Sequence, residues 1–222
     1  MIAPLAGFIA GAAHAASGPD HLAAVAPLSN ADAGKGWRIG AQWGLGHALA
    51  VSVIGALALG TRHILPWDLI SGVSERLVGL VLIGLGLWGL RRAFQHRLHS
   101  HDHDHEAVQH RHPHLHTEEP DADRARRHSH GHAAFGIGAL HGLAGGSHML
   151  AAVAALAFPS LVEAGLYLTA YAVGTIAAMG IFSAALSRLI RREQEGSNSR
   201  APMAAGLCSL AALVCGGFWL LG

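Results

Sequence analysis

Residues 11–24 read GAAHAASGPDHLAA and residues 138–151 read GALHGLAGGSHMLA, and the two stretches align without a gap. Six aligned positions are identical, and both stretches carry two histidines separated by six residues. Each is followed by a segment of similar pattern, WGLGHALA at 43–50 in the first case and YAVGTIAA at 171–178 in the second. The chain therefore reads as two related halves.

Long apolar runs surround these stretches. Of the 222 residues, 51% are apolar and 13% are charged, whereas soluble domains carry about 25% charged residues. Six runs have about the 20-residue length that crosses a bilayer, and they cover 3–28, 39–60, 70–90, 134–157, 163–187 and 202–221. They lack the alternating pattern of barrel strands, so we predict helices. This composition excludes a water-soluble enzyme and a nucleic-acid-binding protein.

We predict an all-α polytopic membrane protein with six transmembrane helices in three parts. Residues 1–91 form a first three-helix repeat, residues 92–133 a cytoplasmic loop, and residues 134–222 a second three-helix repeat. Because three is an odd number, the second repeat enters the membrane from the opposite side. Inverted repeats of this kind place a binding site near the membrane midplane, between the halves.

Basic residues predict the orientation. Of the 15 lysines and arginines, only Arg62 and Arg76 fall on the side opposite the loop between the third and fourth spans. Cytoplasmic loops carry the excess of lysine and arginine. We therefore expect a multi-pass protein of the cell (inner) membrane, with both termini outside and the 92–133 loop in the cytoplasm.

Ionisable residues inside the predicted spans indicate a metal site. Such groups are costly at membrane depth and usually mark a functional position; here they are His14, Asp20, His21, His47, His141 and His148. Imidazoles with a carboxylate suit a borderline divalent ion such as nickel, cobalt or zinc. Without a thiolate among them, copper(I) is disfavoured.

The spacing of these groups requires broken helices. On a continuous helix His14 and His21 lie about 10.5 Å apart along the axis, whereas two nitrogens on one metal ion lie within about 4.2 Å. Proline and glycine open helices. We therefore predict that the first helix of each half is broken, at Ser17, Gly18 and Pro19 and at Gly145 and Gly146.

The predicted cytoplasmic loop is rich in histidine. The chain has 18 histidines, and the loop histidines that we expect to bind metal are His99, His101, His103, His105, His110, His112, His114, His116, His128, His130 and His132. Such tracts bind metals by composition. Their low apolar content predicts disorder in the absence of metal.

The motifs resemble those of the nickel/cobalt transporter superfamily, and particularly its urease-accessory UreH-like and efflux-type branch. His14-Ala-Ala-Ser-Gly-Pro-Asp20-His21 is similar to the family's His-x4-Asp-His signature, with five residues in place of four. Trp43-Gly-Leu-Gly-His47 is similar to the next helix of that family, and His141-Gly-Leu-Ala-Gly145 to its second-half repeat. The resemblance covers nearly all of the chain.

The resemblance implies a six-helix carrier that transports Ni²⁺ or Co²⁺, with Zn²⁺ as a further candidate and with no catalytic cofactor. It implies that His14, Asp20 and His21 are central ligands, with His47 and His141 nearby. The expected partners are the metal ion, the lipid bilayer and a cytoplasmic metallochaperone or urease or hydrogenase maturation proteins, with no nucleic acid. The oligomeric state, the direction of transport and the energy coupling stay open.

Other classes stay open beside this one. An intramembrane metalloenzyme lacks support from any His-Glu-x-x-His motif, so we expect no enzyme activity. A haem-binding protein with two axial histidines and a metal sensor without transport are further alternatives. Cys208 and Cys215 lie seven residues apart in one apolar run. On one helix this spacing is too long for a disulfide.

Overall fold

The computed structural model describes residues 2–31, 36–61, 67–95, 101–105, 108–112, 122–144, 154, 157–195 and 201–221. These residues form seven helices and one two-stranded antiparallel sheet. The elements are α1 (Ile2–Ser17), α2 (Pro19–Ala31), α3 (Gly36–Thr61), α4 (Trp67–Gln95), β1 (His101–His105), β2 (Val108–His112), α5 (Ala122–Leu143), α7 (Leu161–Glu195) and α8 (Ala201–Leu221). The chain is therefore helical, as predicted, apart from one hairpin.

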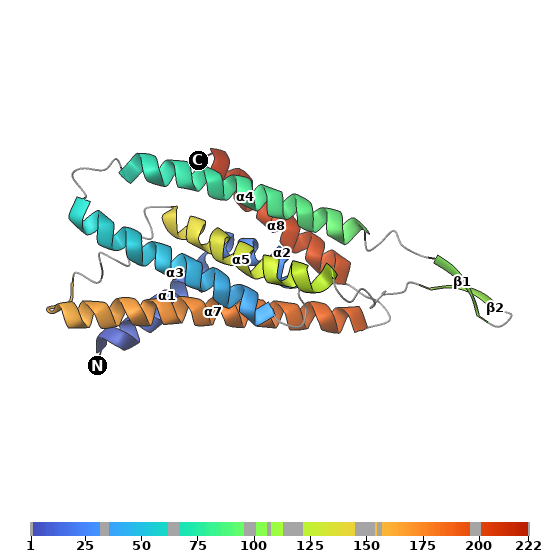
Figure 1. The fold of residues 1–222 in the computed structure, drawn as a ribbon, viewed down its shortest axis with the longest axis horizontal. Coiled ribbons are helices and arrows are strands. Elements are labelled where there is room, and N and C mark those ends of the chain that lie inside the picture. Colours follow the sequence, from blue (N-terminus) through green and yellow to red (C-terminus); the bar gives the residue numbers. More distant parts are fainter. Residues whose placement is uncertain are drawn as a thin grey trace.

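The helices form one elongated bundle (Figure 1). Helix α1 packs along α7, α3 packs along both α5 and α7, and α4 packs along α8. Helices that are far apart in the sequence are therefore neighbours, because α1 contacts α7 and α5 contacts α3. The β1–β2 hairpin lies beyond one end of the bundle, and both chain termini lie toward the other end (Figure 1).

Glycines allow α1 and α7 to approach backbone to backbone. A Cβ added to Gly7 or Gly11 would overlap the carbonyl oxygen of Tyr167 or Tyr171, and one added to Gly174 would overlap that of Phe8. Small residues at such positions are how membrane helices reach close contact, since van der Waals packing replaces the hydrophobic effect between them.

The contact between α3 and α5 is built in the same way. A Cβ added to Gly138 would overlap the carbonyl oxygen of Trp43, and one added to Gly46 would overlap that of Phe135. Gly138 is the residue that aligns with Gly11 in the sequence repeat. Corresponding glycines therefore make corresponding contacts in the two helix pairs.

Buried serines hold the end of α2 against α3 and α7. The Ser187 hydroxyl donates to the Ser29 carbonyl at 3.0 Å, and the Ser183 hydroxyl donates to the Gly36 carbonyl at 2.7 Å. The hydroxyls of Ser29 and Ser183 also contact each other. These hydrogen bonds satisfy hydroxyl and carbonyl groups that water cannot reach.

The bundle has the surface of a membrane protein. Three segments are long and apolar enough to cross a bilayer: Gly72–Phe94, Leu161–Arg192 and Met203–Leu221, in α4, α7 and α8. Large apolar side chains cover their outer faces, and Phe218, for example, is 81% exposed. An apolar surface of this extent fits lipid rather than water. The polytopic membrane class is therefore confirmed, and three of the six predicted spans have spanning length in the described residues.

Two predicted segments have different boundaries. The predicted span 3–28 consists of two helices, α1 and α2, which are separated at Gly18, where the sequence predicted a break. Helix α5 begins at Ala122 and ends at Leu143, whereas we predicted a span over 134–157. Its first turns are rich in alanine and arginine, which favour helix, so the helix extends past the apolar run. The loop expected to be disordered therefore contains the start of α5 and the β1–β2 hairpin.

Candidate metal centre

The interruption between α1 and α2 positions two histidines. Pro19 follows Gly18 and has no backbone N–H to donate, and Gly18 N–H still donates to the His14 carbonyl at 3.2 Å. Helix α2 then begins at Pro19, with Asp20 and His21 in its first turn. As a result the rings of His14 and His21 are 4.9 Å apart between centroids, far closer than on one continuous helix.

Three imidazoles meet inside the bundle: His14 from α1, His21 from α2 and His47 from α3. The His21 and His47 centroids are 5.0 Å apart, and the His14 and His47 centroids are 5.5 Å apart. One ring nitrogen from each residue lies within 4.8 Å of the other two. Nitrogens that share one ion at about 2.1 Å lie up to about 4.2 Å apart. Small side-chain rotations would therefore place all three on a single ion.

Aromatic side chains close the site. Trp43 is fully buried one turn before His47, and the two rings stack at 10° with centroids 5.0 Å apart. Tyr171 on α7 lies with its ring 5.9 Å from that of His14. His21 is 3% exposed and His47 is 0% exposed. His21 and His47 therefore lie in a mostly apolar interior, and His14 is half-buried at its edge.

His141 on α5 has a defined tautomer. Its Nδ1 lies 3.2 Å from the Ile137 carbonyl oxygen, which can only accept, so Nδ1 carries the hydrogen and Nε2 carries the lone pair. Nε2 is buried and has no hydrogen-bond partner among the described residues. The His141 ring lies 5.9 Å from the ring of His21. A histidine held at one nitrogen by a backbone carbonyl, with the other nitrogen open, is typical of metal ligands.

Asp20 supplies a carboxylate beside the imidazoles. Its Oδ2 is 4.0 Å from His21 Nε2, and the residue is 8% exposed. Neither Asp20 nor His141 belongs to the group whose ligand atoms lie within 4.8 Å. Both are therefore placed next to the three-histidine group rather than in it.

Some predicted site residues are not positioned by the structure. His148, Gly145 and Gly146 in the second half lie outside the described residues, as do three loop histidines, His99, His114 and His116. His101, His103, His105, His110 and His112 are on the two strands, and His128, His130 and His132 are on α5.

Trp43 and Tyr171 were not among the site residues predicted from the sequence. They occupy corresponding positions in the WGLGHALA and YAVGTIAA segments. That correspondence was a usable signal, because it places one aromatic residue from each half near the same point. The hydrogen bond from His141 to the Ile137 carbonyl could not be predicted from the sequence, since every residue type has a backbone carbonyl.

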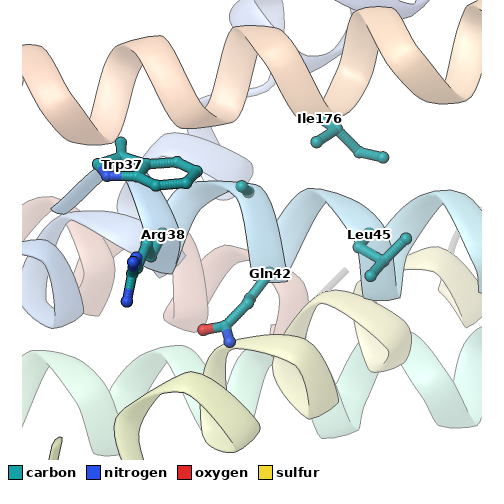
Figure 2. A pocket seen from close by; sticks show the side chains of 6 residues that line it. Trp37, Arg38, Gln42, Leu45 and Ile176 are labelled. Carbon is teal, nitrogen blue, oxygen red and sulfur yellow. The ribbon is translucent and has the colours of Figure 1, made fainter. Parts of the chain in front are cut away.

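A groove of about 420 Å³ lies elsewhere on the bundle. Trp37, Arg38, Gln42 and Leu45 of α3 line it together with Ile176 of α7 (Figure 2). The Arg38 guanidinium lies 5.5 Å from the centre of the Trp37 ring. None of the clustered histidines lines this groove, so it is separate from the candidate metal centre.

The fold and the site define a class: a polytopic helical membrane protein with clustered histidines in its interior. The family profile described as cytochrome c biogenesis protein transmembrane region matches residues 3–218. The chain belongs to this family.

Two curated relatives are similar in sequence, both from Arabidopsis thaliana. The Chloroplast protein FOR GROWTH AND FERTILITY 1 is 33% identical over 179 residues, which is 80% of this chain and 47% of the relative. The Chloroplast protein FOR GROWTH AND FERTILITY 2 is 30% identical over 178 residues, 80% of this chain and 45% of the relative. The chain thus spans about half the length of these relatives. No solved structure matches it.

These comparisons correct the resemblance drawn from the motifs. The chain belongs to the cytochrome c biogenesis family and not to the nickel/cobalt transporter superfamily, so the predicted nickel and cobalt transport function is wrong as well. The predictions that the chain is a membrane protein and that it has transmembrane helices are confirmed. The error has a physical source: a short His-x5-Asp-His motif in alanine- and glycine-rich helices indicates metal-ligand chemistry, and that chemistry does not specify a family or a transported ion.

Proposed function

We propose that this chain is a membrane protein of the cytochrome c biogenesis type whose bundle interior binds one divalent first-row transition-metal ion. His14, His21 and His47 are the ligands in this proposal. The single observation that carries it is the convergence of three imidazole nitrogens, from three different helices, within 4.8 Å of one another. The proposed role is that of a metal-binding protein and not of an enzyme.

Three converging nitrogens favour a metal ion over haem. A haem iron takes two axial histidines on opposite faces of the macrocycle, and a third nitrogen close to both would lie where the macrocycle has to be. Imidazole ligands suit zinc, copper, iron and other borderline ions. The arrangement of the three rings therefore supports a bare ion as the ligand.

His141 and Asp20 complete the proposed site. His141 presents an unprotonated Nε2 and lies beside the rings of His21 and Trp43, so it is the proposed fourth ligand. Asp20 contributes negative charge near the ion, and charge compensation is essential for a dication in a low-dielectric interior.

The two cysteines are a second candidate for the chemically active groups of the protein, because the family description concerns cytochrome c biogenesis. Cys208 and Cys215 are both on α8 and both are free thiols. Seven helical residues separate them by about 10 Å along the axis, beyond the roughly 4.4–6.8 Å Cα separation of a disulfide. The geometry therefore favours the imidazoles as the chemically active groups.

A cysteine variant tests this choice. We expect that the double variant Cys208→Ser, Cys215→Ser binds one metal ion with the affinity of the parent chain, since neither thiol belongs to the three-histidine group. Metal titration of both purified proteins measures this. Mass spectrometry of the oxidised parent should find both thiols free within the monomer. An intramolecular disulfide would contradict the proposal, and so would loss of metal binding in the variant.

The two halves of the bundle are proposed to be inverted repeats. In support, Gly11 against Tyr171 and Gly138 against Trp43 are equivalent contacts made by aligned residues. Each contact joins the first helix of one half to the second helix of the other. The metal site then lies near the membrane midplane, where the halves meet.

The proposed orientation places the β1–β2 hairpin on the cytoplasmic side of a cell (inner) membrane. The excess of basic residues near this end supports it, and so does the position of both termini toward the opposite end of the bundle (Figure 1).

The proposed function is tested by counting bound ions. In a loop-silenced chain, every histidine between residues 92 and 132 is replaced by asparagine, which removes the loop as a competing binder. We expect this chain, purified in detergent, to retain one equivalent of Zn²⁺ after equilibrium dialysis. A folded loop-silenced chain that retains no Zn²⁺ at micromolar concentration would overturn the proposal.

A glycine variant tests how the broken helix supports the site. A Cβ on Gly18 would overlap Nδ1 of His21, so we expect Gly18→Ala to displace that imidazole. Affinity for Zn²⁺ in the loop-silenced chain should fall about 10–100-fold, the effect typical of removing support from a metal ligand. Gly206→Ala is the matched control, because its added methyl meets no described atom within 4 Å. Equal affinities in the two variants would rule out this supporting role.

A further inference from the structure

The histidines of β1 and β2 are in register with one another. The antiparallel pairing places His101 opposite His112 and His103 opposite His110. Residues that face each other across two strands are on the same face of the ribbon, and so are alternate residues along a strand. One ribbon face therefore carries these four histidine positions as two adjacent cross-strand pairs.

The other ribbon face carries different chemistry. Asp102 is opposite Arg111 and Asp104 is opposite Gln109. An acid facing a base across the strands stabilises the pairing by about 0.2–1 kcal/mol. The alternation His-Asp-His-Asp-His thus places the histidine positions on one ribbon face and the acidic positions on the other, whereas composition alone would treat the tract as one mixture.

The four histidine positions have the dimensions of one metal site. Cross-strand neighbours have Cβ atoms about 4.5–5.5 Å apart, and alternate residues along a strand are about 6.6 Å apart. Each corner of this rectangle is thus about 4 Å from its centre. An imidazole together with a metal–nitrogen bond of about 2.1 Å spans such a distance.

We propose that the hairpin is a second metal site, for one divalent first-row transition-metal ion outside the membrane, because its register brings the positions of His101, His103, His110 and His112 together on one ribbon face. His105 is opposite Val108 and so has no imidazole across from it. This site uses none of the residues of the interior site. Imidazole suits Cu²⁺, and near-planar sets of nitrogen ligands are typical of this ion, so Cu²⁺ is the suitable probe.

The test uses the full chain with His14, His21 and His47 replaced by asparagine, so that its outcome is independent of the interior site. We expect one equivalent of Cu²⁺ with a four-nitrogen pattern in electron paramagnetic resonance. The key variant exchanges two neighbours, His103→Asp with Asp104→His, and keeps the composition constant. We expect its affinity to fall by about tenfold or more, as at other metal sites that lose a contributing group.

Two control variants distinguish Cu²⁺ binding that depends on the strand register from binding that depends on composition alone. His105→Asn should bind Cu²⁺ like the parent, although it removes one histidine, and Asp102→Asn should retain the four-nitrogen pattern. The proposal is overturned if the exchanged variant binds as tightly as the parent, since the tract then binds by composition alone. It is also overturned if His105→Asn weakens binding as much as the exchange does.

Discussion

Replacing His21 with alanine in the loop-silenced chain is expected to weaken Zn²⁺ binding by more than about 100-fold, because removal of mere supporting groups already costs 10–100-fold at metal sites. His21 is the common neighbour of the cluster, with ring centroids 4.9 Å from His14, 5.0 Å from His47 and 5.9 Å from His141. Competition with a chromophoric chelator measures the affinity.

His63→Ala is the control for this experiment, since it removes the same residue type at a position that is not among the proposed ligands. It should bind Zn²⁺ like the parent. Circular dichroism in detergent checks that both variants keep their helices. If the folded His21→Ala variant binds Zn²⁺ as tightly as the His63→Ala variant, His21 is not a ligand and the proposed site is wrong.

Adding one methyl group at Gly138 is expected to destabilise the bundle strongly. The new Cβ would overlap the Trp43 carbonyl, which belongs to the backbone of α3 and cannot rotate away. Overpacking of this kind costs about 1–3 kcal/mol, and the rigid contact favours the upper end of that range. We therefore expect a clear decrease of the thermal unfolding midpoint of Gly138→Ala in detergent.

Gly136→Ala provides the comparison on the same helix. A Cβ there meets no described atom within 4 Å, and alanine favours helix over glycine by about 1 kcal/mol. The unfolding midpoint of Gly136→Ala should thus be unchanged or higher. Equal midpoints for the two variants would contradict the close packing of α3 and α5. Equal midpoints would also weaken the equivalence of Gly138 with Gly11 on α1.

The approach of His14 to His21 was predictable because proline and glycine leave local marks in a sequence, whereas His47 was placed nearby only through the family resemblance. Ser17-Gly18-Pro19 indicates a broken helix, and only a broken helix brings histidines seven residues apart to one point. The repeat between residues 11–24 and 138–151 likewise indicated which helices correspond. Both signals depend on residue type and spacing, which sequence contains directly.

The extent of α5 and the hairpin were not predictable by the same reasoning. Apolar runs identify where lipid contacts a helix, but α5 continues for about three turns into a charged segment from Ala122. The His101–His105 segment was interpreted by its composition, although its strict alternation is the period of a strand. The family was also misassigned, because ligand chemistry recurs in unrelated membrane proteins.

The most direct measurement is X-ray absorption spectroscopy of the loop-silenced chain with one equivalent of Zn²⁺. We expect three or four imidazole nitrogens at about 2.0–2.1 Å from the metal, from His14, His21 and His47 with His141 as the fourth. The spectrum of the Cys208→Ser, Cys215→Ser variant should be identical. Sulfur ligands at about 2.3 Å, or a shell of water oxygens with fewer than three imidazoles, would contradict a histidine-bound ion in the bundle interior.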